Sequence, residues 1–175
     1  MLIKNLIDEE YFRKTAELYC EIWKESPWYE DFWRVEGVVE DIRTQSKKKN
    51  AISLIALDDQ ENIIGFIWGY QVSTKRLAEI SGHTTSFWKE IIGTNAIFYV
   101  DDFGVKSEWR GNGIGQSLAA ELIKRIPRSE IKAVTLRTDV DAGPARTVYA
   151  KIGFEESSVR DQKHKNRSYW LMKLS

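Results

Sequence analysis

The chain has 175 residues, of which 42% are hydrophobic and 30% charged, with 26 basic and 26 acidic side chains. This indicates one globular domain with its own core and argues against disorder. The balanced charge gives no support for nucleic acid as a partner, and no apolar run reaches the roughly 18 residues of a membrane span. Without a signal segment, and with one cysteine (Cys20) expected to be a buried thiol, the chain is expected to be cytoplasmic.

The first part of the chain predicts helices and strands from its apolar spacing and turn residues. In chain order we expect a strand at 2–7, a helix capped by Asp8 and extending through Lys24, a helix at 31–45, and strands at 51–57 and 62–72. Residues 73–95 indicate no more than two short helical turns.

The second part continues in the same mixed pattern. We expect a strand at 96–105, a helix at 114–126 stopped by Pro127, a strand at 133–138, a helix from Pro144 to a cap at Gly153, and a hairpin of 154–159 with 168–174. The expected order is therefore β-α-α-β-β-β-α-β-α-β-β.

The most informative segment is residues 98–117, FYVDDFGVKSEWRGNGIGQS, in which an apolar strand is followed by a glycine-rich turn and a helix. Glycines let a ligand approach the backbone, and the helix N-terminus offers unpaired N–H groups and a positive dipole end. Such a turn suits a phosphate or pyrophosphate. The glycine spacing fits neither the dinucleotide fingerprint nor the P-loop, and a merely tight strand-to-helix connection is the alternative.

Two motifs in this order resemble those of the GNAT N-acetyltransferases. The family's acetyl-CoA signature, Q/R-x-x-G-x-G/A, is met by Arg110, Gly113 and Gly115. Its later L-Y-x-x-x-G-F element is similar to the run VYAKIGF that begins at Val148. The resemblance covers nearly the whole chain. It implies a single N-acetyltransferase domain over residues 1–175, an α/β fold with a splayed mixed sheet flanked by helices, and acetyl-CoA as co-substrate.

The resemblance also implies which residues hold the cofactor. The turn amides would face the pyrophosphate, and the preceding strand would pair with the pantetheine arm, with the Val105 N–H polarising the thioester carbonyl. The expected cofactor-binding residues are Phe103, Val105, Arg110, Gly111, Asn112, Gly113, Ile114, Gly115, Gln116 and Ser117. The chain departs from the family at Ala142, where many members carry an asparagine that contacts pantetheine.

Tyr149 matches the family's tyrosine near the cofactor sulfur. The resemblance therefore implies that its phenol protonates or hydrogen-bonds the leaving thiolate. An aromatic side chain packed in the core is the alternative.

Asp101 and Asp102 interrupt an otherwise apolar strand, where unpaired charge is costly. Because successive strand residues face opposite sides, we expect only one of them to point into the site. Residues 99–105 are similar to a stretch in the family's diamine and polyamine acetyltransferases. By that match Asp101 would accept the amine's proton or bind its ammonium, and Asp102 would be structural or a second contact. The alternative is that sheet-end partners satisfy both carboxylates.

Aromatic and acidic residues gather between the first two helices, a region that usually walls the acceptor site in this family. The expected substrate-binding residues are Trp28, Tyr29, Glu30 and Asp31, since aromatics with carboxylates suit an ammonium group. A core or dimer-interface role is equally open, and Trp68 and Tyr70 are expected in the core. His83 and His164 read as exposed loop residues, and nothing shows metal-site spacing.

The charge is unevenly distributed. Residues 1–102 hold 12 basic and 18 acidic side chains, whereas residues 103–175 hold 14 and 8. The basic half contains the glycine turn, so the acidic half is expected to supply most of a site for a cationic amine. Scattered surface charge is the alternative.

The predicted activity is direct acetyl transfer from acetyl-CoA to a primary amine of a small molecule: a polyamine, a diamine or an aminoglycoside-like compound. A protein or peptide amine is the second candidate acceptor, and an acyl-CoA sensor without turnover is the third reading. The family resemblance suggests a homodimer, through the C-terminal strands or the N-terminal helices.

Overall fold

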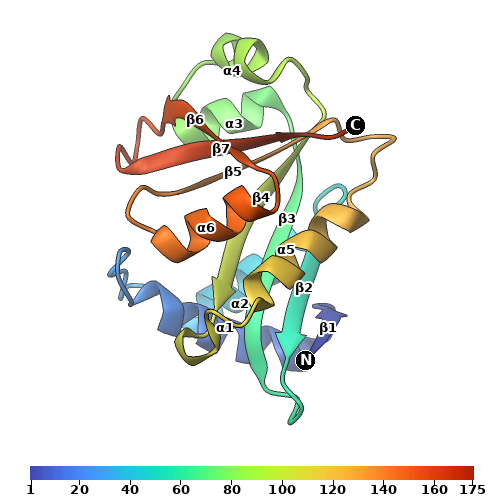
Figure 1. Cartoon of the computed structure of the whole chain (residues 1–175), viewed down its shortest axis with the longest axis vertical. Helices are drawn as coiled ribbons and strands as arrows, with labels where there is room; N and C mark the ends of the chain where they lie inside the picture. Colours follow the sequence, from blue (N-terminus) through green and yellow to red (C-terminus); the bar gives the residue numbers. More distant parts are fainter.

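Seven strands form one sheet in the order β1-β2-β3-β4-β5-β7-β6 in the computed structural model, which describes all 175 residues (Figure 1). The β4–β5 pair is parallel and every other pair is antiparallel. The elements are β1 (Leu2–Asn5), α1 (Glu9–Trp23), α2 (Val35–Gln45), β2 (Ile52–Leu57), β3 (Ile63–Val72), α3 (Thr74–Ser81), α4 (Thr85–Ile92), β4 (Ile97–Val105), α5 (Ile114–Arg125), β5 (Ala133–Asp139), α6 (Gly143–Lys151), β6 (Glu155–Arg160) and β7 (Arg167–Lys173).

The segment between β3 and β4 holds two complete helices rather than the expected short turns. The side chains of Ser73 and Thr84 accept hydrogen bonds from backbone N–H groups in the first turns of α3 and α4. Gly82 and Gly93 end these helices in the left-handed conformation. These are the cap residues that start and stop helices, so the signal was present in the sequence but spread over very short elements.

Helices cover both faces of the sheet (Figure 1). On one face α5 and α6 pack on the sheet through a core that includes Leu118, Leu122 and Tyr149. On the other face α1 and α2 bury Phe12 and Ile42 with the opposite side of β2 and β3. No helix combines the length and apolarity needed to cross a lipid bilayer.

The start of the second helix differs from the prediction. Residues 29–34 form no helix, and α2 begins only at Val35. Phe32, which lies inside the predicted helix, is in the irregular segment and is 63% exposed, while Val38 and Ile42 of α2 are buried. The apolar spacing was correct for the helix proper, but its extrapolation toward the N-terminus was wrong.

The sheet splays between β4 and β5. These strands pair only where Ile97, Phe98 and Tyr99 face residues 133–135. Beyond this point β5 pairs with β7 alone, and β4 pairs with β3 alone. The C-terminal half of β4 therefore has an open edge toward the gap between the two strands, and both cavities described below are lined by residues of this half.

Candidate active site

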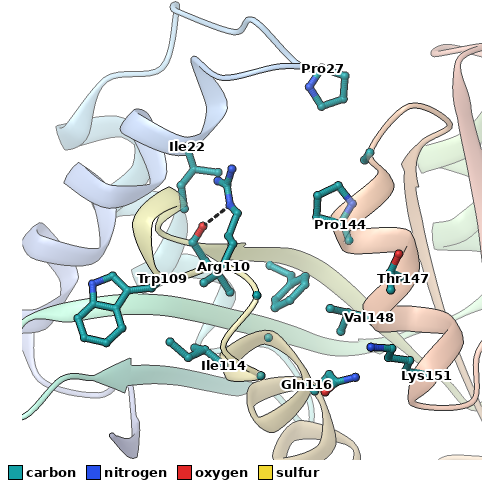
Figure 2. A pocket seen from close by; sticks show the side chains of 18 of the residues that line it. Ile22, Pro27, Trp109, Arg110, Ile114, Gln116, Pro144, Thr147, Val148 and Lys151 are labelled. Atoms are coloured by element: carbon teal, nitrogen blue, oxygen red, sulfur yellow. Dashed lines mark hydrogen bonds between the residues drawn. The ribbon is translucent and has the colours of Figure 1, made fainter.

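Two cavities adjoin along the open half of β4. The first, the turn cavity, measures about 420 Å³ and is bounded by the glycine turn, the start of α5 and the face of α6 (Figure 2). The second, the carboxylate cavity, measures about 370 Å³ and contains Asp101, Asp102 and Tyr149. Trp28, Phe103 and Ala145 line both cavities, so groups held in one are next to groups held in the other.

The turn cavity presents a row of free backbone donors. None of the six N–H groups from Gly111 to Gln116 donates to an acceptor within the chain, whereas the next amide, Ser117, bonds the Gly113 carbonyl. Gly111 and Gly113 adopt left-handed φ angles of 80° and 78°, which orient successive amides into one concave turn. At the N-terminus of α5 these donors favour a diphosphate.

The edge of β4 adds further free amides. The Lys106 N–H bonds the Ile64 carbonyl of β3, and N–H groups in an antiparallel ladder alternate between partner and opposite side. Phe103 and Val105 therefore direct their N–H groups away from β3, toward the gap that β5 has left. An extended amide-bearing ligand such as pantetheine could pair with this edge as an added strand.

The remaining expected cofactor residues fall into two groups. Arg110, Gly111, Gly113, Ile114, Gly115 and Gln116 line the turn cavity, together with Phe103 and Val105. Asn112 and Ser117 do not line it: the Asn112 amide bonds the carbonyls of Trp109 and Arg110, closing the turn from outside. The free Asn112 N–H still belongs to the row of turn amides, so contact of Asn112 and Ser117 with the cofactor stays a prediction.

Arg110 contributes less free charge than its sequence position suggests. Its Nε donates to the Val105 carbonyl at 2.9 Å (Figure 2). Its guanidinium lies 2.6 Å from a Glu25 carboxylate oxygen. Arg110 thereby ties the turn to β4 and to the end of α1. The exposed cation on the opposite wall is Lys151 of α6, which the sequence did not single out as a ligand residue.

Asp101 and Asp102 both line the carboxylate cavity, which corrects the expectation that only one would do so. Asp102 pairs with Trp68, but Gly69 pairs with Val100, so Asp101 is an extra residue in β4. Such a β-bulge breaks the alternation of side chains between faces. Gly69 permits the bulge, since a Cβ there would lie 2.4 Å from the Tyr99 carbonyl oxygen.

The two carboxyl groups have different surroundings. Burial raises the pKa of Asp101, and a hydrogen bond from Tyr70 with the charges of Lys48 and Arg137 opposes that rise. Burial and the negative charge of Asp101 raise the pKa of Asp102 well above its ordinary value. A buried carboxyl group with a raised pKa can accept a proton near neutral pH.

The other charges of the carboxylate cavity are mostly paired. Arg137 lies 2.6 Å from Asp161, and Arg167 lies 3.0 Å from Glu30. Asp41 at the cavity wall has no such partner among the ion pairs of the chain. Most lining residues come from the acidic first 102 residues, as expected, although the two arginines come from the basic half. Unpaired carboxylates therefore dominate the cavity and favour a cationic ligand.

Tyr149 is 6% exposed and packs among Phe103, Phe154 and Trp170. Burial, with a contribution from the charge of Asp102, raises its pKa above the ordinary value of a phenol. The hydroxyl therefore keeps its proton at neutral pH. Tyr149 is thus both a core aromatic and a lining residue of the carboxylate cavity.

The expected acceptor-binding residues separate. Trp28 and Glu30 line the carboxylate cavity. The Glu30 carboxylate accepts hydrogen bonds from the side chains of Trp33 and Arg167. Tyr29 and Asp31 line neither cavity, and Tyr29 is 72% exposed. Residues 29–34 run as an irregular segment, and the roles of Tyr29 and Asp31 in binding the acceptor stay predictions.

Several lining residues escaped the sequence reasoning. Trp68 is buried as expected but also lines the carboxylate cavity, and the Tyr70 hydroxyl donates to Asp101. His164, though exposed, lies at the cavity wall, whereas His83 stacks on Phe87 elsewhere. The available signal for Trp68 and Tyr70 was that they are alternate residues of a buried strand and both carry a polar atom. Only the pairing of β3 with β4 shows which groups these atoms face.

Comparison of the sequence with known proteins shows which family the chain resembles. The model of the acetyltransferase (GNAT) family matches residues 7–154. The mycothiol acetyltransferase of Arthrobacter sp. (strain FB24) is 34% identical over 101 residues, which are 58% of this chain and 26% of that protein. The chain thus spans about a quarter of the length of this relative.

Solved structures share the fold over almost the whole chain. A GNAT-family acetyltransferase from Staphylococcus aureus Mu50 is 16% identical, with a TM-score of 0.73 and 99% of both chains covered. The PaiA N-acetyltransferase of Thermoplasma acidophilum, solved with coenzyme A, is 17% identical, with a TM-score of 0.70 and coverage of 99% and 100%. Arabidopsis thaliana NAA60, solved with a bisubstrate analogue, is 19% identical, with a TM-score of 0.66 and coverage of 98% and 97%.

These matches confirm the resemblance and the α/β fold class. The family model covers most of the chain, including both motifs and the turn whose amides are free to bind a diphosphate. The chain belongs to the acetyltransferase (GNAT) family.

Proposed function

We propose that this enzyme acetylates a primary amine on a small cationic molecule, with a diamine, polyamine or aminoglycoside-like amine as the first candidates. The observation that carries the proposal is the junction of the two cavities. One is walled by free backbone N–H groups, the other by unpaired carboxylates, and they share Trp28, Phe103 and Ala145. A thioester in the first and an ammonium group in the second would meet at Phe103.

The residues of the turn cavity would bind the co-substrate. The amides of residues 111–116 would hold its pyrophosphate, and the β4 edge would hold its pantetheine arm. Acetyl-CoA supplies the acyl group as a thioester. The Val105 N–H would donate to the thioester carbonyl oxygen as negative charge develops on it.

The residues of the carboxylate cavity would manage the protons. Asp101 and Asp102 would bind the ammonium group and take one proton from it, which frees the nitrogen lone pair for attack. The new N–C bond forms as the C–S bond breaks. Tyr149 would give its proton to the departing sulfur, and the amine's second proton restores the phenol through solvent.

The first experiment is to measure thiol release from acetyl-CoA across polyamines, diamines, aminoglycosides, amino acids and short peptides, with a reaction lacking acceptor as control. Release that depends on a small cationic amine supports the proposal. Release at the no-acceptor rate with all these amines would contradict it and favour an acyl-CoA-binding sensor without turnover.

A peptide α-amine or lysine is a second candidate acceptor. Phe32 lines the carboxylate cavity yet is 63% exposed, which offers an apolar contact at the mouth for an extended ligand. Similar solved structures include NAA60 with a bisubstrate analogue and the NatC complex bound to Gag peptide and CoA. Turnover of peptides with little turnover of free amines would favour this candidate.

We also propose a homodimer, on the family resemblance. Of the two C-terminal strands, β6 forms the sheet edge and is the one that would meet a second copy. Sedimentation velocity of the purified chain measures the assembly directly, and a monomer at micromolar concentration would contradict it.

A further inference from the structure

Tyr70 makes the one hydrogen bond that the chain gives to the Asp101 side chain. Its hydroxyl donates to Asp101 Oδ2 over 2.9 Å. Tyr70 is 4% exposed and lies on β3, opposite the bulge that turns Asp101 into the carboxylate cavity. Asp101 Oδ1 accepts no hydrogen bond from the chain and is left for a ligand.

Lys48 lies on the face of the same tyrosine. Its Nζ is 3.6 Å from the centre of the Tyr70 ring, and it forms no ion pair with an acidic side chain. A cation over an aromatic face draws on the electron density of the ring, which makes the phenol a stronger hydrogen-bond donor. Lys48 lies in a run of three lysines just beyond α2, and it packs against this buried tyrosine.

The charged neighbours of Asp101 come from several elements. Cations approach it from the end of α2, from α3 and from β5, as Lys48, Arg76 and Arg137. The negative charge of Asp101 in turn opposes the ionisation of its neighbour Asp102 on the same strand. Other neighbouring groups that can titrate are Tyr19 of α1, Asp41 of α2, and Tyr99 of β4.

Asp102 has a different environment. It shares the cavity lining with Tyr19, Trp68 and Tyr149 but accepts no hydrogen bond from them, and its strongest charged neighbour is the anion Asp101. No cation is among its principal neighbours. Two carboxyl groups in one cavity cannot both ionise freely, so the surroundings decide which of them carries the charge.

We propose that Tyr70, supported by Lys48, is a positioning residue that keeps Asp101 as the anionic member of the pair, with Oδ1 available to an ammonium group. The proposal rests on the proposed function only where it takes that ammonium group to belong to the acceptor. The hydrogen bond and its effect on Asp101 do not require a bound acceptor. The role of Tyr70 and the proposed function can therefore fail separately.

The test follows the titration of Asp101 itself. Protein labelled with ¹³Cγ-aspartate is titrated by NMR with no acceptor present, and the Asp101 resonance is identified by its loss in Asp101→Asn. In Tyr70→Phe the carboxylate loses its donor, so its pKa should rise and its midpoint should move up by about one pH unit. Lys48→Met should move the midpoint in the same direction by less.

Tyr11→Phe is the matched control, because it removes a phenol from α1 that lines neither cavity. It should leave the Asp101 midpoint unchanged. An unchanged midpoint in folded Tyr70→Phe would overturn the proposal. If Tyr70→Phe does not fold, Lys48→Met decides in its place, and an unchanged midpoint there overturns it equally.

A second readout connects the proposal to turnover. With an amine that the thiol-release assay accepts, the acidic limb of the kcat/KM profile should move upward in Tyr70→Phe in step with the NMR midpoint. A shifted midpoint with no amine accepted would sustain the Tyr70 role while the proposed function fails. A shifted midpoint with an unshifted limb would contradict the role of Asp101 in binding the ammonium.

Discussion

The turn cavity and the carboxylate cavity adjoin, but they are built in opposite ways. The turn cavity relies on the backbone: consecutive N–H groups, two left-handed glycines and one helix end, all within residues 111–116. The carboxylate cavity relies on side chains from α1, α2, β3, β4, β5 and α6 and on a bulge that aims two of them. The first depends on local conformation, and the second depends on how distant strands and helices meet.

This difference has consequences for function. A site made of amides tolerates changes in side chains but not in backbone torsion angles, and its affinity should change little with pH. A site made of buried carboxyl groups depends on residue identity and on protonation. Substitutions in the two cavities should therefore separate into effects on coenzyme A binding and effects on turnover.

The largest effect is expected from Tyr149→Phe. Loss of the proton donor should lower kcat by about 100-fold, the lower end of what one general acid contributes. Coenzyme A affinity, measured by calorimetry, should change little because the ring and its packing remain. An unchanged kcat would remove Tyr149 from the mechanism.

Asp101→Asn should lower kcat/KM for the acceptor by about 30-fold at neutral pH, from loss of about 2 kcal/mol of charged hydrogen bonding. The carboxylate must be ionised to act, so the wild-type rate falls as pH drops through its pKa. The variant should lack that acidic limb. Asp59→Asn, at an exposed turn, is the control, and a normal acceptor KM and pH profile in Asp101→Asn would exclude the role.

Gly113→Ala should weaken coenzyme A binding by about tenfold, because an L-residue in the left-handed region costs about 1–2 kcal/mol. Gly93→Ala is a matched control, since Gly93 has a φ of 73° against 78° and, like Gly113, open space around a new Cβ. Both variants should melt at lower temperature, but only Gly113→Ala should lose affinity. Equal affinity in both would show that the turn amides do not bind the coenzyme.

The smallest effect is expected from Lys151→Met. This exposed cation should contribute about threefold to coenzyme A affinity at low salt and little at high salt, because solvent and ions screen it. Lys124→Met, on α5 and away from the turn cavity, should have no effect at either salt concentration. An effect of Lys151→Met that persists at high salt would indicate a buried contact instead.

Local sequence was sufficient for most of the helices and strands and for the backbone of the turn cavity. Strand, glycine turn and helix follow one another in the chain, so the amides of residues 111–116 converge wherever the rest of the molecule lies. The periodicity of α1 and α5, and Pro144 at the start of α6, were read for the same reason. The motif around Tyr149 indicated the family to which the chain belongs, and the family model confirms that assignment.

Tertiary structure decided the carboxylate cavity. The bulge at Asp101 is a mismatch between β3 and β4, which strand alternation within one sequence cannot reveal, so only one of the two aspartates was expected to face the site. The pairing of Tyr70 with Asp101 joins residues 31 positions apart. Local sequence determines torsion angles and periodicity, but which charges share a cavity depends on strand register and splay, and these are set by contacts between distant segments.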